Sequence, residues 1–260
     1  MAKAIHVTKG LSLWALIAAF AFLWVPLGQH EFLLQHWMKV GTFMAPFLIL
    51  VAFSFSASEK SIDARSISLA LLVAYILHQF EEHWVDIHGR TYAFKANLNE
   101  FLSGLLGSAQ VQELMSDMSV FVINTSLVWL VGALAVWRGD GHTFAALCMA
   151  AIVVVNAVSH IGAGLMSGSY NPGLLTAVLV FLPVGIGSYV LLARNEAATV
   201  GLISASLIWG LAAHLIMVGG ILAMNQMSDP PETVFFAGLI AWSILPAFIF
   251  PNRARNVVVR

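Results

Sequence analysis

Eight long apolar runs, separated by short polar breaks, most constrain how this chain can fold. They cover approximately residues 11–27, 40–57, 66–84, 119–137, 142–165, 173–193, 199–224 and 233–250. Each run is long enough, or nearly so, to cross about 30 Å of hydrocarbon as a helix that rises 1.5 Å per residue. Only 10% of the residues are charged, whereas soluble domains carry about 25%. The sequence therefore predicts an all-α, polytopic transmembrane bundle of about eight spans.

Lysine and arginine residues are distributed unequally between the two ends of these runs. With eight spans both termini lie on one side, which collects Lys3, Lys9, Lys60, Arg65, Arg138, Arg194, Arg253, Arg255 and Arg260. The other side collects Lys39, Arg90 and Lys95. This excess of positive charge predicts that both termini lie in the cytoplasm, whereas seven spans would place the two basic termini on opposite sides.

The whole chain, residues 1–260, is predicted to form a single membrane domain, because no linker is long enough to divide it. Within it we expect an N-terminal helical hairpin at 1–57, a site-bearing bundle at 66–225 and a last span at 233–250.

The longest stretch outside the spans follows the third run and faces the outer side. From about residue 97 to residue 118 its apolar side chains recur at helical spacing, as in Leu98, Phe101 and Leu105. We expect an interfacial amphipathic helix here, or two short ones. Such a segment either connects two spans or covers a site as a lid.

The most unusual polar residues lie at the end of the third run, in the sequence His78-Gln79-Phe80-Glu81-Glu82. On an α-helix His78 lies one turn before both glutamates, so the three side chains share a face. Ionisable groups within a membrane span are costly unless they are paired or bind something, and they therefore indicate a functional site. The alternatives are a buried ion pair between His78 and Glu82, or glutamates solvated beyond a shorter span.

Other spans are expected to bring polar residues to the same half of the membrane. The third, fifth and seventh runs all point outward in this topology, which places Asn156, His160 and His214 in the outer half together with the motif. Taken singly, each histidine is more often a hydrogen-bonded core residue than a ligand. Their sorting to one half of the membrane favours a shared site.

Imidazole and carboxylate groups are the usual ligands of zinc, iron and manganese sites. We therefore predict a divalent metal site in which zinc is favoured and iron or copper is the alternative. Glu81 or Glu82 would act as the catalytic base toward a metal-bound water while the other ligates. The candidate ligands are His78, Glu81, Glu82, Asn156, His160 and His214, with Asn156 either a weak ligand or an orienting group for His160.

Neighbouring polar and aromatic residues are assigned to the surface or to the membrane interface. We expect His83, Asp86 and His88 at the surface, and His36 with Trp37 in an interfacial belt. His30 and Glu31 fit either an interfacial cap or the wall of the site. None of these residues enters the predicted ligand set.

A helix start is predicted at Asn171 and Pro172, which are favoured at the N-cap and at the first helical position. This helix begins on the outer side, so its free N–H groups point toward the same half of the membrane as the proposed site. They either hold an anionic group of a substrate or simply form a helix cap at a tight turn.

Two features of the composition exclude other kinds of protein. The formal net charge of −1 at pH 7 excludes a nucleic-acid-binding surface. The single cysteine, Cys148, excludes an internal disulfide framework and a cysteine-rich metal site. The expected partners are therefore the membrane itself and a lipid or other hydrophobic small molecule, with assembly into an oligomer or a larger complex left open.

Three sequence blocks resemble a known family. His78-Gln79-Phe80-Glu81-Glu82 is similar to the namesake motif of the HXXEE family of bacterial integral membrane proteins. Asn156-x-x-x-His160 and Tyr170-x-Pro172-Gly173-x-x-Thr176 are similar to that family's later signature, and the resemblance covers about 66–190. It implies a helical protein of the bacterial inner membrane. It also supports one site that contains His78, Glu81, Glu82, Asn156 and His160. The family's activity is unsettled, so the resemblance implies no substrate.

Three functions are compatible with these features. The leading hypothesis is a metal-dependent membrane enzyme with a site in the outer leaflet that hydrolyses a lipid or another hydrophobic substrate. The first alternative is a di-iron or copper oxidoreductase of the hydroxylase or monooxygenase type, which needs more ligands and a route for electrons. The second is a transporter, or an accessory subunit of a membrane complex, in which the glutamates carry protons or a metal ion.

Overall fold

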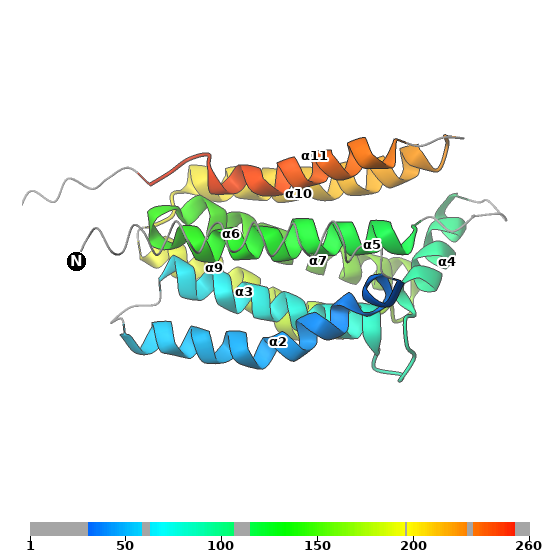
Figure 1. Cartoon of the computed structure of the whole chain (residues 1–260), viewed down its shortest axis with the longest axis horizontal. Helices are drawn as coiled ribbons and strands as arrows, with labels where there is room; N and C mark the ends of the chain where they lie inside the picture. The colour runs from blue at the N-terminus through cyan, green and yellow to red at the C-terminus, as the bar shows by residue number, and fades with distance from the viewer. Residues whose placement is uncertain (1–30, 59–62, 107–114, 196, 228–230, 253–260) are drawn as a thin grey trace, which may run out of the picture.

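In the computed structural model, residues 31–58, 63–106, 115–195, 197–227 and 231–252 are described, and these ranges contain helices but no β-strand. The all-α prediction is thus confirmed. Figure 1 shows most of the helices lying roughly along one long axis, with α4 across one end. The helices are α2 (Glu31–Ser58), α3 (Ala64–Gln79), α4 (Phe94–Leu106), α5 (Asp117–Ile123), α6 (Val131–Arg138), α7 (Thr143–Ser167), α8 (Leu174–Thr176), α9 (Leu182–Arg194), α10 (Val200–Met224) and α11 (Glu232–Ile244).

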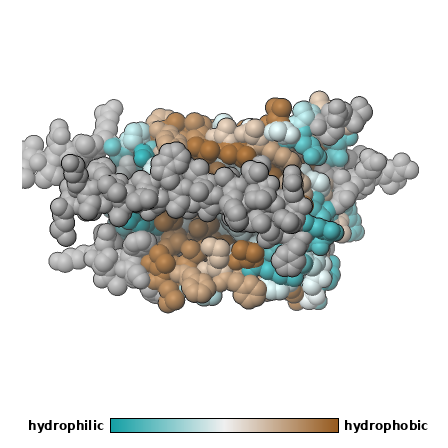
Figure 2. Space-filling view, in the orientation of Figure 1, coloured by the Kyte–Doolittle hydropathy of each residue, from teal (hydrophilic) through white to brown (hydrophobic). Residues whose placement is uncertain are grey.

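Within the described ranges, four continuous helical stretches are long and apolar enough to cross a membrane: Asp117–Arg138, Thr143–Ser167, Leu174–Arg194 and Val200–Met224. They coincide within a few residues with four of the predicted runs. A shorter apolar helix covers Glu232–Ala247. These four helices suggest a membrane protein, but the described residues do not show the eight spans that the sequence predicted. The run expected at 11–27 lies outside the described residues. In Figure 2 brown, apolar side chains occupy the middle of the visible face and teal, polar ones lie toward its ends.

Helix α2 begins earlier than the sequence predicted. We expected a short connection up to residue 39 and a span from residue 40, but the helix begins at Glu31. The reason is that the apolar residues of the expected connection pack into the bundle, where Trp37 and Met38 are buried. Trp37 stacks edge-on against His83 and Trp129, so it is a core residue and the expectation of an interfacial belt was wrong for it.

Helix α7 lies at the centre of the bundle and contacts α3, α6, α9 and α10. Its residues from Phe144 to Val153 are all buried. Small residues let its neighbours come close, as membrane helices require. A Cβ atom added to Gly210 of α10 would lie 2.8 Å from the Cβ of Ala151. This close packing fixes α10 beside α7, with His214 one turn beyond the contact.

The predicted amphipathic segment is helical from Phe94 to Leu106, and residues 107–114 lie outside the described part of the chain. Helix α5 then begins at Asp117, where the Ser116 side chain accepts a hydrogen bond from the Ser119 N–H. An ion pair of 2.7 Å between Lys95 and Asp117 joins the starts of α4 and α5. Helix α4 is therefore held across the end of the bundle to which the motif points (Figure 1).

Candidate metal centre

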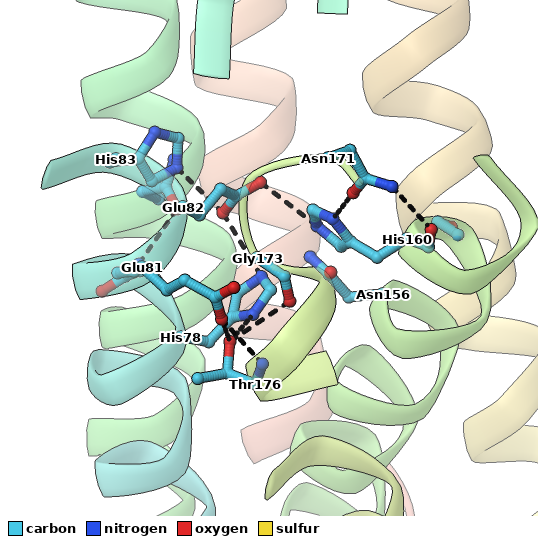
Figure 3. A network of polar contacts seen from close by, with 12 residues as sticks. His78, Glu81, Glu82, His83, Asn156, His160, Asn171, Gly173 and Thr176 are labelled. Carbon is cyan, nitrogen blue, oxygen red and sulfur yellow. Dashed lines mark hydrogen bonds and ion pairs between the residues drawn. The ribbon is translucent and has the colours of Figure 1, made fainter. Parts of the chain in front are cut away.

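Three of the predicted site residues, His78, Glu82 and His160, come together at this end of the bundle. One ligand atom from each lies within 4.8 Å of the other two. The Nε2 atom of His78 is 3.4 Å from Oε2 of Glu82, and Nε2 of His160 is 3.3 Å from Oε1 of the same carboxylate (Figure 3). Ligand atoms in a tetrahedral site with bonds of about 2 Å lie roughly 3.3 Å apart. The three groups are thus already at metal-binding separations.

The backbone that carries the motif changes its helical form at this point. Helix α3 ends at Gln79 and continues as one π-helical turn, Phe80–Trp84, before the extended Val85. Single π-helical turns occur frequently at functional sites. Here the turn carries both glutamates, whose side chains reach different partners (Figure 3).

The protonation of His78 follows from its neighbours. Thr176 Oγ1 donates its hydrogen to the Glu81 carboxylate or to the Gly173 carbonyl, neither of which can donate back. Thr176 Oγ1 must therefore accept the 2.9 Å hydrogen bond from Nδ1–H of His78. A neutral His78 consequently presents a bare lone pair on Nε2, a buried atom with no hydrogen-bond partner among the described residues.

The same reasoning shows which ring nitrogen of His160 carries the hydrogen. Asn171 donates from Nδ2 to the backbone carbonyl of His160 at 3.0 Å, so its Oδ1 is the atom that faces the ring. That oxygen lies 2.7 Å from Nδ1 of His160, which must carry the hydrogen. The Nε2 atom of a neutral His160 therefore also presents a lone pair to Glu82.

Two imidazole lone pairs and one carboxylate repel one another in a buried site unless a proton or a metal cation lies between them. Two histidines and a glutamate form the ligand set of catalytic zinc in several hydrolases. The outer partners fit a metal site as well, because metal-binding histidines usually donate their second N–H to a fixed acceptor. These residues therefore suit a divalent metal ion.

Glu81 has a different role from Glu82. Its carboxylate accepts hydrogen bonds from the Tyr170 hydroxyl at 2.8 Å and from the backbone N–H groups of Leu175 and Thr176 at 3.1 and 2.7 Å, besides the Thr176 hydroxyl. Burial and this contact with Glu81 raise the pKa of Tyr170. Helix α8 begins at Leu174 with Gly173 at its N-cap, so the predicted start at Asn171 and Pro172 was wrong, and its N–H groups hold this carboxylate of the chain itself. Glu81 lies outside the candidate metal ligands His78, Glu82 and His160, the metal group.

Asn156 and His214 also lie outside the metal group, although both are close to it. Asn156 donates a 2.6 Å hydrogen bond to the Tyr75 hydroxyl. His214 donates from Nδ1 to the Gly210 carbonyl at 2.9 Å, which leaves its Nε2 free of that bond. Both residues line the cavity onto which Glu82 and His160 open.

The sequence interpretation missed His83 and Asp86, which are buried although we expected them at the surface; His88 is exposed, as expected. His83 packs between Trp37 and Phe94, and its Nε2 lies 3.0 Å from Oε2 of Glu82. The carboxylate of Glu82 thus has an outer hydrogen-bond donor of its own. The only sequence signal was position, because His83 directly follows the motif.

Asp86 organises the loop that follows the π-helical turn. Burial alone would raise the pKa of Asp86, but the backbone N–H groups of Arg90 and His88 and the guanidinium of Arg90 outweigh it and lower the pKa. The guanidinium of Arg90 and the ring of His88 in turn lie against Tyr170, at 5.9 and 4.9 Å. This loop therefore covers the side of the site where Tyr170 binds Glu81.

A cavity of about 350 Å³ lies beside the metal group and beneath α4. Its polar wall includes Glu82, His160, Asn156 and His214. The remainder is mainly apolar, from Met115 before α5, from α4, α5, α7 and α10, and from the stretch between α5 and α6: Phe94, Leu98, Phe101, Met115, Ile123, Leu127, Val128, Ile152, Ala163, Ala213, Met217, Val218, Ile221 and Leu222. A hydrophobic molecule of moderate size fits this space.

Residues 69–188 match the model of a family described as protein of unknown function with HXXEE motif. This match confirms the resemblance drawn from the sequence, and it contains all three members of the metal group. No curated protein and no solved structure matches the chain.

Proposed function

We propose that the HXXEE segment of this chain, residues 69–188, binds one divalent metal ion on His78, Glu82 and His160, and that the protein is a membrane hydrolase of a hydrophobic substrate. The observation that carries this proposal is the convergence of two Nε2 atoms on one buried carboxylate, in rings whose Nδ1 atoms are both bonded to acceptors. Zinc is favoured because three nitrogen and oxygen ligands leave a fourth position for water or substrate.

A site with two metal ions has less support. Di-metal carboxylate sites need several carboxylates that face one another. The adjacent carboxylate, Glu81, is engaged by Tyr170, Leu175 and Thr176, and the described residues contain one cluster of metal-binding side chains. This favours the hydrolase over the di-iron oxidoreductase.

Different residues of the chain would then serve as metal ligand, as catalytic base and as orienting groups. A bound zinc ion would lower the pKa of a water molecule and polarise a substrate carbonyl. Glu82 is a ligand and Glu81 is held by other bonds, so neither is free to accept a proton. His214 is the better candidate base, because its Nδ1–H is fixed on Gly210 and its Nε2 lone pair is left for the cavity that it lines. Asn171 and Thr176 hold the two ligand imidazoles in the required tautomers.

The location that we propose is the outer half of the bacterial inner membrane. Eight spans with both termini in the cytoplasm place nine of the twelve lysine and arginine residues on the cytoplasmic side. In this arrangement the metal site and α4 lie at the outer side, where a lipid or another hydrophobic small molecule reaches the cavity from the membrane and water reaches it from outside.

Metal analysis of the purified protein tests the proposal. We expect about one zinc ion per chain, lost in Glu82→Gln and in His160→Ala and retained in His88→Ala, which changes an exposed histidine near the site. A well-folded wild-type protein that binds no divalent metal would show that His78, Glu82 and His160 are a buried ion pair network. Stoichiometric zinc without hydrolysis of any lipid ester or amide would support the transporter or accessory-subunit alternative.

A further inference from the structure

The cavity beside the metal group reaches the surface of the protein along the side of the bundle. Among the described residues that line the cavity, only Ser159 on α7 and Val218 on α10 are exposed. The side chain of Val218 is 42% exposed, whereas Ala213 and Ile221, which line the cavity from the same helix, are buried. Residues that both line a cavity and are exposed mark the place where it opens. The opening is therefore flanked by Ser159 and Val218.

The packing of α7 and α10 explains why the cavity opens between these two helices. They touch closely at Ala151 and Gly210, where an added Cβ atom on the glycine would lie 2.8 Å from the alanine Cβ. Beyond this contact, toward the metal group, one face of each helix lines the cavity, from Ile152 to Ala163 on α7 and from Ala213 to Leu222 on α10. The two faces thus border a common space, and the small side chain of Ser159 leaves its edge open.

The opening lies within the apolar length of both helices. Thr143–Ser167 and Val200–Met224 are each long and apolar enough to cross a membrane. Ser159 lies about 12 Å and Val218 about 9 Å from the last residue of its helix, at a rise of 1.5 Å per residue. Each helix has 25 residues and is about 38 Å long, which exceeds the roughly 30 Å of hydrocarbon in a bilayer. A helix centred in the membrane therefore places the opening among lipid chains.

We propose that one acyl chain of a bilayer lipid enters the cavity sideways, through the opening between Ser159 and Val218. The mainly apolar lining suits a hydrocarbon chain, and a volume of about 350 Å³ is near the lower end of the range for small-molecule pockets, roughly 300–1,000 Å³. The cavity thus takes one chain, and any second chain of the same lipid stays in the bilayer.

The position of the opening also relates the chain to the metal group. His160 directly follows Ser159 on α7, so a ligand of the proposed metal ion lies at the same depth as the opening. The linkage between an entering chain and its head group would pass close to this depth. Entry of the chain is argued from the opening alone, whereas cleavage of the lipid rests on the proposed hydrolase.

Photocrosslinking of the full chain in liposomes tests this inference. The probe is a phosphatidylcholine analogue whose chains are ether-linked, so that a hydrolase does not cleave them, with a diazirine at the end of one chain. We expect crosslinks to Leu127, Val128 and Ile152, which line the cavity and are buried, so that a chain on the lipid-facing surface does not reach them. These crosslinks should fall about tenfold in Ser159→Trp and in Val218→Trp, because a side chain that overfills the opening excludes the chain.

Val158→Trp and Leu211→Trp are the matched controls, because both side chains are exposed on the same two helices and neither lines the cavity. Crosslinking inside the cavity should be unchanged in them. Wild-type crosslinks confined to lipid-facing residues such as Leu211 and Leu215 would overturn the inference. Cavity crosslinks that persist in both Ser159→Trp and Val218→Trp would overturn the route between α7 and α10.

Zinc content is measured on the same samples to separate the two proposals. Crosslinking inside the cavity without stoichiometric zinc refutes only the metal-dependent hydrolase. Stoichiometric zinc without crosslinking inside the cavity refutes only the sideways entry of a lipid chain.

Discussion

The carboxylates of Glu81 and Glu82 belong to adjacent residues but enter separate networks. Glu81 accepts from Tyr170, Leu175 and Thr176, and it joins the end of α3 to the start of α8. Glu82 faces the Nε2 atoms of His78 and His160. Thr176 links the two networks, because its hydroxyl contacts both Glu81 and His78. The Glu81 carboxylate thus joins α3 to α8, and the Glu82 carboxylate completes the candidate metal site.

Replacing each glutamate by glutamine should therefore have different effects. Glu82→Gln should abolish stoichiometric metal binding and leave the fold largely intact, because the amide is a poor ligand of similar size. Glu81→Gln should keep the metal ligands but destabilise the protein, since its NH₂ group cannot accept from backbone N–H groups. Each lost hydrogen bond to a charged group costs about 1.5–3 kcal/mol. Metal content and thermal unfolding in detergent measure both effects, and the reverse pattern would contradict the division of roles.

The hydrogen bonds that orient the two histidines should control metal affinity. Thr176→Val and Asn171→Leu remove the acceptors of His78 Nδ1 and His160 Nδ1, so the rings are free to adopt the wrong tautomer. We expect zinc affinity to fall by about 10- to 100-fold in each variant. Competition with a chelator gives the affinities. Thr125→Val is the matched control, because that buried hydroxyl donates only within its own helix, and a similar loss there would contradict the prediction.

Gly173 should be irreplaceable at its position beside the histidines. Its φ of +92° disfavours other residues, and an added Cβ would lie 2.6 Å from Cε1 of His78 and 2.9 Å from Cε1 of His160. Gly168 also has a positive φ, +63°, but an added Cβ there meets nothing within 4 Å. Both Gly→Ala variants should lose about 1–3 kcal/mol of stability through backbone strain. Only Gly173→Ala should lose its zinc as well, and zinc retention by that variant would count against the site.

His142 should make the stability of the protein depend on pH. It lies between α6 and α7, it is fully buried, and neither ring nitrogen has a partner among the described residues. Burial and the positive charge of Arg138 lower its pKa below the ordinary value of 6.5. The unfolded chain therefore binds the proton first, and stability is present above 6.5 and lost as pH falls toward the lowered pKa.

Unfolding midpoints of the wild type and His142→Leu at about pH 8 and about pH 5 measure this effect. We expect the wild type to lose more stability between the two pH values than the variant, which cannot bind that proton. Parallel losses in the two proteins would show that other groups cause the pH dependence.

Much of the fold was predictable from hydrophobic length alone. Runs of apolar residues between charged breaks located α7, α10 and the stretch that contains α9 to within a few residues, because burial in hydrocarbon leaves the backbone no alternative to a helix. The start of α2 was not predictable in this way. Trp37 reads equally well as an interfacial or a core residue, and only tertiary packing against His83 and Trp129 decides between them.

The sequence predicted which residues come together in the site better than it predicted their hydrogen-bond partners. Sorting the polar residues by the predicted topology grouped His78, Glu82 and His160, which come together in the structure. It also included Glu81, Asn156 and His214, which lie outside that cluster. The same reasoning treated Glu81 and Glu82 as equivalent, because an ideal helix puts both on the face of His78. The π-helical turn and the donors of Tyr170, Leu175 and Thr176 separate them, and these come from a segment about 90 residues away. His83 looked like a surface residue because the third run ends there.

The hydrogen bond between His78 and Thr176 joins residues 98 positions apart, and its consequence concerns biogenesis. In the proposed membrane topology, the segment with His78 and Glu82 would be inserted before those with His160 and Thr176 exist. The first two proposed ligands alone would hold a metal ion weakly, and the imidazole of His78 would lack its orienting partner. Metal capture would then follow the insertion of α7 and α8, and a bound ion would report that these late helices have docked.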